Sequence, residues 1–97
     1  MFLQKGKKMK AVISVVGKDS VGIIAKVSAE CAKFSVNIVE ISQTVLDGYF
    51  TMIMITDVQN LTVPFTDFAD AMAKLGSESH LEIRAMHEDI FNAMHNI

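Results

Sequence analysis

Six residues near the start of the chain, Gly17-Lys18-Asp19-Ser20-Val21-Gly22, are the best suited to hold a small polar ligand. Glycine lets the backbone approach a ligand closely, and N–H groups at the start of a following helix favour a bound anion. The Asp19 carboxylate lies in the same loop. The loop equally suits an ordinary strand-to-helix turn in which Asp19 or Ser20 caps the helix. From these six residues alone, both interpretations stay open.

The other reactive residue types do not form a catalytic or metal-binding pattern. His80, His87 and His95 are seven and eight residues apart, without the spacing of a metal-binding motif, so we expect them on the solvent-facing surface. Cys31 is the only cysteine and is expected to be a buried free thiol on a helix. The pair Glu88-Asp89 suits the first turn of a helix, where negative charge is favourable. We therefore expect no enzyme activity, no cofactor and no metal site.

Length and composition indicate one globular domain. The 97 residues are 51% hydrophobic and 21% charged, and no apolar run is long enough to span a membrane. We interpret residues 1–8, which carry three lysines, as a mobile basic tail, and residues 9–97 as the folded domain. Six basic and eleven acidic residues remain in that domain, a balance that argues against nucleic-acid binding. A single cysteine suits a reducing cytoplasm.

A strand, a helix and a hairpin are expected to position the loop. Lys10 to Val16 is apolar and rich in β-branched residues, which predicts a central strand. Apolar residues then recur every three or four positions from Val21 to Phe34, the pattern of an amphipathic helix packed on a sheet. Two strands, Ile38–Leu46 and Tyr49–Asp57, are predicted to meet across Asp47-Gly48, because a tight hairpin turn needs positive φ at both central residues.

The two-residue turn also predicts which hairpin residues lie opposite each other. One face would pair Val45 with Phe50, Gln43 with Met52, Ile41 with Met54 and Val39 with Thr56. That face is apolar apart from Gln43 and Thr56, so we expect helices to cover it and Gln43 to be a buried polar group that needs a hydrogen-bond partner. The other face is mixed, and either water or a second subunit could cover it.

The second half of the chain repeats the helix and strand pattern. An apolar stripe from Phe65 to Leu75 predicts a helix that has Pro64 in its first turn and ends at Gly76. Alternation from Ser79 to Met86 predicts a half-exposed strand, and Glu88 to Asn96 a short C-terminal helix. The predicted fold class is α+β: a ferredoxin-like βαββαβ sandwich, whose four-stranded antiparallel sheet of order 4-1-3-2 carries two helices on one face.

Several of these segments resemble the ACT domain, a small-molecule regulatory module of amino-acid metabolism. The resemblance runs from Met9 to Ile97 and rests on Lys18-Asp19-x-x-Gly22-Ile23, on the Val36-Asn37-Ile38 entry to the second strand and on Ile41-Ser42-Gln43-Thr44. The chain looks like the small stand-alone bacterial and archaeal ACT proteins, whose relatives include the glycine cleavage system repressor and the N-terminal part of formyltetrahydrofolate deformylase. The resemblance implies control by a ligand and not catalysis.

The resemblance also implies where a ligand binds. Family members commonly hold an amino acid at a dimer interface, between the first strand-helix loop of one subunit and the second strand of its neighbour. By position, the pocket would use Asp19, the loop backbone at Ser20, Val21, Gly22 and Ile23, and the side-chain amide of Asn37 beside Ile38. Many ligand-binding members carry Asn, or a Pro before the loop glycine, where this chain has Asp19 and Val21, so the identity of the ligand stays open. Asn37 equally suits a left-handed turn residue that ends the first helix.

A stand-alone domain of this kind has no attached enzyme to regulate, so its output would pass through assembly. The second strand is predicted at an edge of the sheet, where pairing with a second copy would hide unpaired backbone groups. We therefore expect a homodimer, a small amino acid as ligand, and a regulated enzyme or regulator protein as partner. The alternative is a protein-interaction or structural dimer that keeps the fold without a ligand.

Overall fold

The strands and helices follow one another in the predicted order. The computed structural model describes residues 9–18 and 20–94; the predicted basic tail, Asp19 and residues 95–97 lie outside the described residues. The elements are β1 (Lys10–Lys18), α1 (Ile23–Lys33), β2 (Asn37–Leu46), β3 (Tyr49–Asp57), α2 (Phe65–Ser79), β4 (Leu81–His87) and α3 (Glu88–Met94). The type of each predicted element is confirmed.

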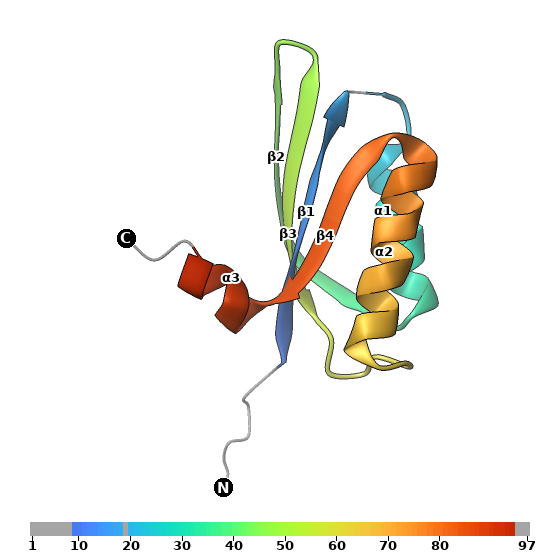
Figure 1. The fold of residues 1–97 in the computed structure, drawn as a ribbon, viewed down its shortest axis with the longest axis vertical. Coiled ribbons are helices and arrows are strands. Elements are labelled where there is room, and N and C mark those ends of the chain that lie inside the picture. The colour runs from blue at the N-terminus through green and yellow to red at the C-terminus, as the bar shows by residue number, and fades with distance from the viewer. Residues whose placement is uncertain (1–8, 19, 95–97) are drawn as a thin grey trace, which may run out of the picture.

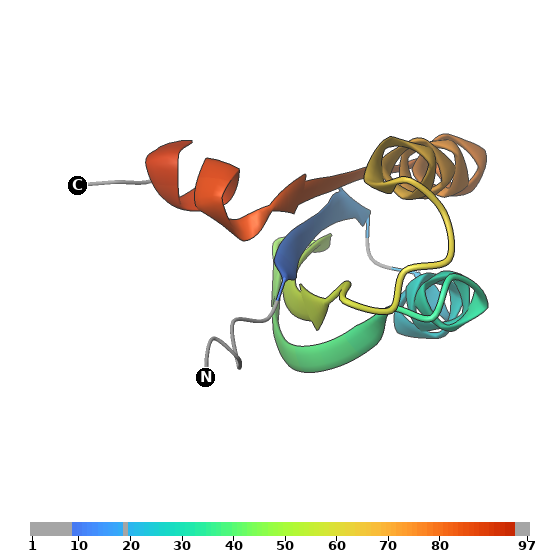
Figure 2. The same cartoon turned by 90° about the horizontal axis from the view of Figure 1, so that it is seen from below.

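The four strands form one antiparallel sheet of order β2-β3-β1-β4. Helices α1 and α2 lie side by side on one face of the sheet, whereas α3 lies on the other side (Figures 1 and 2). Counted from the β4 edge, this is the predicted order 4-1-3-2, so the ferredoxin-like fold is confirmed. Strand β2 lies at one edge of the sheet, as the sequence predicts.

The core lies between the sheet and the two long helices. Alternate residues of β1 and β3 point toward the helices, and apolar side chains of α1 and α2 cover them; these buried residues include Ala11, Ile13, Val15, Phe50, Met52, Met54, Val27, Cys31, Phe68 and Met72. Thr56 is the one buried polar residue among the described residues, and its hydroxyl donates a hydrogen bond to the Ala11 carbonyl at 2.9 Å. A buried hydroxyl without a hydrogen bond would lower the free energy of unfolding by about 1–3 kcal/mol, and this bond prevents that loss.

The hairpin register is confirmed near the turn and departs from the prediction at its far end. Val45 lies opposite Phe50, and Ile41 lies opposite Met54, as expected. A β-bulge between Ile38 and Glu40 then puts Ile38, and not Val39, opposite Thr56. A bulge adds one residue to a single strand, so strict alternation from the turn fails beyond it.

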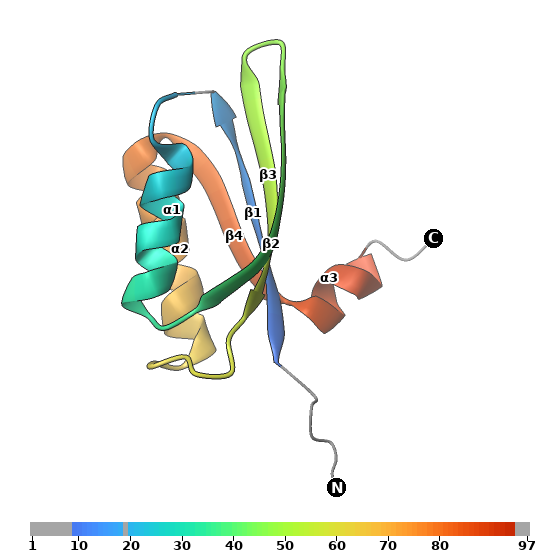
Figure 3. The same cartoon turned by 180° about the vertical axis from the view of Figure 1, so that it is seen from behind.

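Gln43 is exposed, which corrects the prediction of a buried amide. It lies opposite the buried Met52, on the face of the sheet that carries the helices. The end of the β2–β3 hairpin, however, extends past the ends of α1 and α2 (Figure 3). Water can therefore solvate the amide, and Gln43 needs no protein partner.

Helix α2 does not end at Gly76, as the sequence predicts, but continues to Ser79 and ends at His80, whose φ is 60°. Gly76 is buried inside the helix, where α2 approaches β4 closely. A Cβ at this position would lie 2.7 Å from the Leu81 carbonyl oxygen. Glycine is therefore needed here for close packing and not for ending the helix. At the other end of α2, Pro64 is the N-cap residue.

Candidate functional site

The turn between β1 and α1 is shaped by Gly22. This residue is the N-cap of α1 and has φ 88° and ψ 8°, in the left-handed region that favours glycine. Its carbonyl accepts the first hydrogen bond of the helix, from the Lys26 N–H at 3.0 Å. Ser20 lies two residues before the N-cap, so the prediction that Ser20 caps the helix is wrong. The predicted roles of Asp19, as a cap or as a ligand contact, lie outside the described residues.

The start of α1 is open to solvent. Because Gly22 has no side chain, it cannot cap the first-turn N–H groups itself, and those groups have no partner within the helix. Ser20 and Gly22 are exposed, and the Val21 side chain is 99% exposed. Ile23, by contrast, is buried and anchors the helix to the core. The turn therefore presents backbone donors and one apolar side chain at a fixed place on the surface.

Asn37 begins β2 and does not end α1. The left-handed residue after α1 is Ser35, with φ 60°, so the left-handed turn that the sequence allowed for Asn37 is wrong. The Val36 N–H donates to the Cys31 carbonyl at 2.9 Å, which closes the helix before Asn37 is reached. Asn37 is exposed, and the neighbouring Ile38 is half-buried against the core. An exposed amide at a strand start can donate and accept hydrogen bonds with a ligand.

These two groups of site residues lie at opposite ends of the sheet within one chain. Lys18, just before the turn, lies opposite Tyr49, whereas Asn37 and Lys10 both lie opposite Asp57. Eight steps of β1 at about 3.3 Å each separate these ends by roughly 26 Å. Figure 1 shows the turn at the upper end of β1 and the start of β2 near the lower end of α1. One chain alone therefore does not bring Asn37 to the turn.

Strand β2 carries apolar side chains that its own chain leaves uncovered. Val39, Ile41 and Val45 are 51%, 40% and 54% exposed. An edge strand also leaves one row of backbone N–H and C=O groups without a partner in the sheet. Both features are typical of a strand that pairs with another chain.

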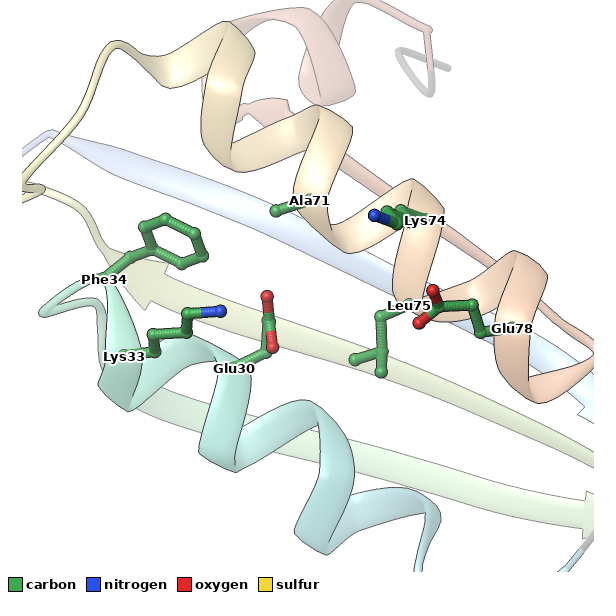
Figure 4. Close-up of a pocket in the computed structure, with 7 residues that line it drawn as sticks. All are labelled: Glu30, Lys33, Phe34, Ala71, Lys74, Leu75 and Glu78. Atoms are coloured by element: carbon green, nitrogen blue, oxygen red, sulfur yellow. The ribbon is translucent and has the colours of Figure 1, made fainter.

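A groove of about 300 Å³ between α1 and α2 is a feature that the sequence did not predict (Figure 4). Four charged residues, Glu30, Lys33, Lys74 and Glu78, and three apolar residues, Phe34, Ala71 and Leu75, line it. Glu30 and Lys33 are three residues apart on α1, and Lys74 and Glu78 are four apart on α2, so the two charges of each pair lie on the same face of their helix. All four charged side chains are partly or fully exposed, as on an ordinary solvated helix face.

The titratable residues do not form a metal-binding cluster among residues 9–18 and 20–94. His80 is exposed, as predicted, but His87 is half-buried and stacks on Phe65 with ring centroids 4.0 Å apart. His95 lies outside the described residues. Burial, with a smaller contribution from Glu30, raises the pKa of the Cys31 thiol to about 11, as expected for an unreactive core cysteine. None of the helices that the structure describes is both long and apolar enough to cross a membrane.

The chain matches the ACT domain family over residues 10–86. It is 51% identical over 89 residues to a UPF0237 protein of Clostridium perfringens, and the match covers 92% of this chain and 100% of the relative. The solved structure of an ACT domain protein from Streptococcus pneumoniae is 40% identical, with a TM-score of 0.76 over 87% of this chain and 94% of that chain.

Two more distant structures share the fold. A putative glycine cleavage system transcriptional repressor is 22% identical, with a TM-score of 0.70 over 84% of this chain and 46% of that chain. A formyltetrahydrofolate deformylase from Pseudomonas syringae is 23% identical, with a TM-score of 0.76 over 87% of this chain and 29% of that chain. The family match and the relatives from Clostridium perfringens and Streptococcus pneumoniae confirm the resemblance that the loop and strand residues indicate.

Proposed function

This chain belongs to the ACT domain family, and from that premise we propose that it is a non-catalytic regulatory module that binds a small amino acid at the interface of a homodimer. Its ligand site is formed by Asp19, the backbone from Ser20 to Ile23, and the Asn37 amide with Ile38 of a second copy. The observation that carries the proposal is the open start of α1 at Gly22. No described side chain caps the N–H groups at this helix N-terminus, and such groups favour a carboxylate, which every amino acid carries.

The second half of the site comes from another copy in this proposal, because the two groups of residues lie too far apart within one chain. Pairing of two β2 edges in antiparallel directions brings the start of one β2 toward the opposite end of the other sheet. The same contact covers Val39, Ile41 and Val45 and satisfies the unpaired backbone groups of the edge. The Asn37 amide then donates to or accepts from the ligand, and Asp19 pairs with its ammonium group.

In this proposal the output of the module passes through contacts with other proteins. A ligand that binds only the assembled form shifts the equilibrium toward that form by mass action. A regulated enzyme or regulator protein that recognises the assembled form is then controlled by the amino acid. The unpaired Cys31 agrees with a reducing compartment such as the cytoplasm.

A thermal-shift screen against the twenty amino acids tests this proposal. A ligand at a hundredfold excess over its Kd stabilises the folded protein by about 2.7 kcal/mol, which raises Tm by roughly 10 °C or more in a chain of this size. Asn37→Ala is expected to abolish the shift without unfolding the protein, because Asn37 is exposed. Asn60→Ala changes another exposed amide, in the turn that follows β3 and outside the proposed pocket, and serves as the matched control.

The screen also separates the proposal from its alternative. If no amino acid at millimolar concentration changes Tm, the chain is a ligand-free interaction or structural dimer. If an amino acid raises Tm equally in wild type and in Asn37→Ala, the ligand binds elsewhere and the proposed pocket is wrong.

A further inference from the structure

The face of the sheet opposite α1 and α2, here called the open face, carries both apolar and polar residues. Its residues form rows across the strands: Lys18 with Tyr49 and Leu46, Val16 with Thr51 and Thr44, Ser14 with Ile53 and Ser42, and Val12 with Ile55 and Glu40. Polar residues of β4, Glu82 and Arg84, continue two of these rows and pair with each other at 2.8 Å. The rows thus run from the end that holds Lys18 to the end from which α3 leaves the sheet.

Helix α3 covers only one end of the open face. It contacts β1 and β4, and Val12 at that end is 1% exposed. The helix then projects outward from the sheet, on the side opposite α1 and α2 (Figure 2). No residue of α3 is buried, and its Ile90 and Met94 side chains are 52% and 62% exposed. A seven-residue helix is marginal in water unless its apolar side packs on something, so α3 lacks part of the packing that it needs.

The other end of the open face is bare. Val16, Tyr49 and Leu46 are 44%, 54% and 74% exposed, and no element of the described chain covers them. Lys18 is exposed beside them, and the structure shows no ion pair for it within the described residues. This end therefore offers an apolar surface with the positive charge of Lys18 on its β1 side and the negative charge of Asp47, in the β2–β3 turn, on its β2 side.

The acidic first turn of α3 is complementary in charge to Lys18 on the β1 side of the bare end, and the apolar residues of α3 are complementary to the exposed apolar residues there. Helix α3 carries Glu88 and Asp89 in its first turn and Ile90 and Met94 after them. The bare end carries Lys18 beside Val16, Tyr49 and Leu46. Seven steps of β1, roughly 23 Å, separate Lys18 from Ala11, which lies opposite His87 just before α3. Two copies can be placed with their open faces toward each other, related by a twofold axis that runs between the two sheets and perpendicular to the strands. This arrangement places each α3 over the bare end of the other copy.

We propose that the open face binds a second copy of this chain, with α3 of each copy lying on the Val16, Tyr49 and Leu46 surface of the other and its acidic first turn beside Lys18. The contact is isologous, because each copy supplies the same arm and the same surface. A second copy fits better than an unrelated protein, since both halves of the complementary pair occur on one face of one chain. This interface is separate from the β2 edge and does not depend on ligand binding.

Disulfide trapping between two singly substituted chains tests the contact. Chains carrying Lys18→Cys are mixed with chains carrying Asp89→Cys and oxidised mildly, and the mixed disulfide is measured by mass spectrometry. Both positions are exposed, so neither substitution removes core packing, and the buried Cys31 does not compete. The control mixture replaces Lys18→Cys with Lys74→Cys, an exposed lysine on α2.

The mixed disulfide is expected to exceed the control by about tenfold or more, because docking raises the local concentration of the two thiols toward the millimolar range. Edge-to-edge pairing of β2 cannot produce this result. In that dimer, Lys18 and the α3 of the second copy are separated by about five strand spacings, roughly 24 Å, far beyond disulfide reach. A yield equal to the control overturns the proposal and leaves the β2 dimer and its ligand site untouched.

Charge reversal provides an independent measurement on the same pair. Lys18→Glu and Asp89→Lys are each expected to weaken self-association by roughly fivefold, and the double variant to restore most of the affinity. Lys74→Glu is the matched control and is expected to leave the affinity unchanged. Additive losses in the double variant contradict the proposed pairing of these two charges.

Discussion

Gly76 shows how a single atom limits the packing of α2 on β4. A Cβ at this position would lie 2.7 Å from the Leu81 carbonyl oxygen and 3.0 Å from an Ile83 side-chain carbon. The Leu81 carbonyl oxygen belongs to the backbone, so it cannot move away from an added Cβ as the end of a flexible side chain can. Gly76→Ala is therefore expected to lower the free energy of unfolding by about 1–3 kcal/mol, even though alanine favours helix formation. Urea denaturation followed by circular dichroism measures this difference.

The control for Gly76 is Ser77→Ala, one position further along the same helix, where the side chain is exposed. There the helix propensity of alanine acts without a steric conflict, so stability should stay the same or rise by a few tenths of a kcal/mol. If Gly76→Ala is as stable as Ser77→Ala, the close approach of α2 to β4 is not what selects glycine.

Cys31 gives a residue-scale prediction that depends on pH. Burial first, and the Glu30 carboxylate second, raise its pKa from 9.0 to about 11 in the folded protein. Because the folded state favours the neutral thiol, this stabilising contribution is present below about pH 9 and is lost as the pH rises toward 11. The thiol should therefore stay unreactive toward a disulfide reagent at pH 8 until urea unfolds the chain. Rapid reaction under native conditions would show that Cys31 is accessible.

At the scale of elements, local signals in the sequence account for the strands and helices, and tertiary packing accounts for the departures. Asp47 and Gly48 have φ of 53° and 82°, as the predicted tight turn requires, so the register near the turn follows from two residues. Glycine also looked like the end of α2, but Gly76 is instead required by the approach of β4, which sequence periodicity does not reveal. The bulge at Val39 is equally invisible to an alternating pattern.

Only part of the candidate site could be predicted, because local sequence does not show how the elements pack together. The loop at Gly22 and the start of β2 at Asn37 follow from local sequence and from the family resemblance. The position of the left-handed residue at Ser35 does not follow from them, because asparagine tolerates that conformation better than serine and local sequence therefore favours Asn37. The uncovered α3 and the groove between α1 and α2 depend on how elements meet in space, so no short segment predicts them.

The conformation of the β2–β3 turn can be tested with two substitutions of Gly48 that differ in how well they tolerate positive φ. Gly48 has φ 82°, and the space around its Cβ position is open, so only the backbone conformation restricts the residue. Gly48→Asn should lower the free energy of unfolding by a few tenths of a kcal/mol, since asparagine tolerates positive φ. Gly48→Val should lower it by about 1–2 kcal/mol. Equal stability of the two variants in urea denaturation would mean that the turn does not hold this conformation in solution.

At the scale of the whole molecule, the two long helices protect one face of the sheet and leave both β2 and the open face without full cover. Apart from Met9, Val21 and Ile24, the large apolar residues that remain exposed in the described part of the chain fall into two groups, one on β2 and one on the open face with α3. Large contiguous apolar surfaces are uncommon on monomers and typically mark interfaces. Two separate surfaces of this kind lead us to expect an assembly larger than a dimer, in which β2 pairs one set of copies and the open face pairs another.

A substitution on β2 can disrupt the β2 contact without affecting the open face, so the contribution of each interface to the assembly can be measured separately. Val45 is 54% exposed on β2, and a lysine there places charge on the paired edge without disturbing the core. Val45→Lys is therefore expected to halve the mass measured by light scattering at micromolar concentration, because only the open-face contact remains. Ala73→Lys, on the exposed side of α2, is the control and should keep the wild-type mass. An unchanged mass in Val45→Lys would show that β2 does not hold the copies together, and a monomeric wild type would exclude both interfaces.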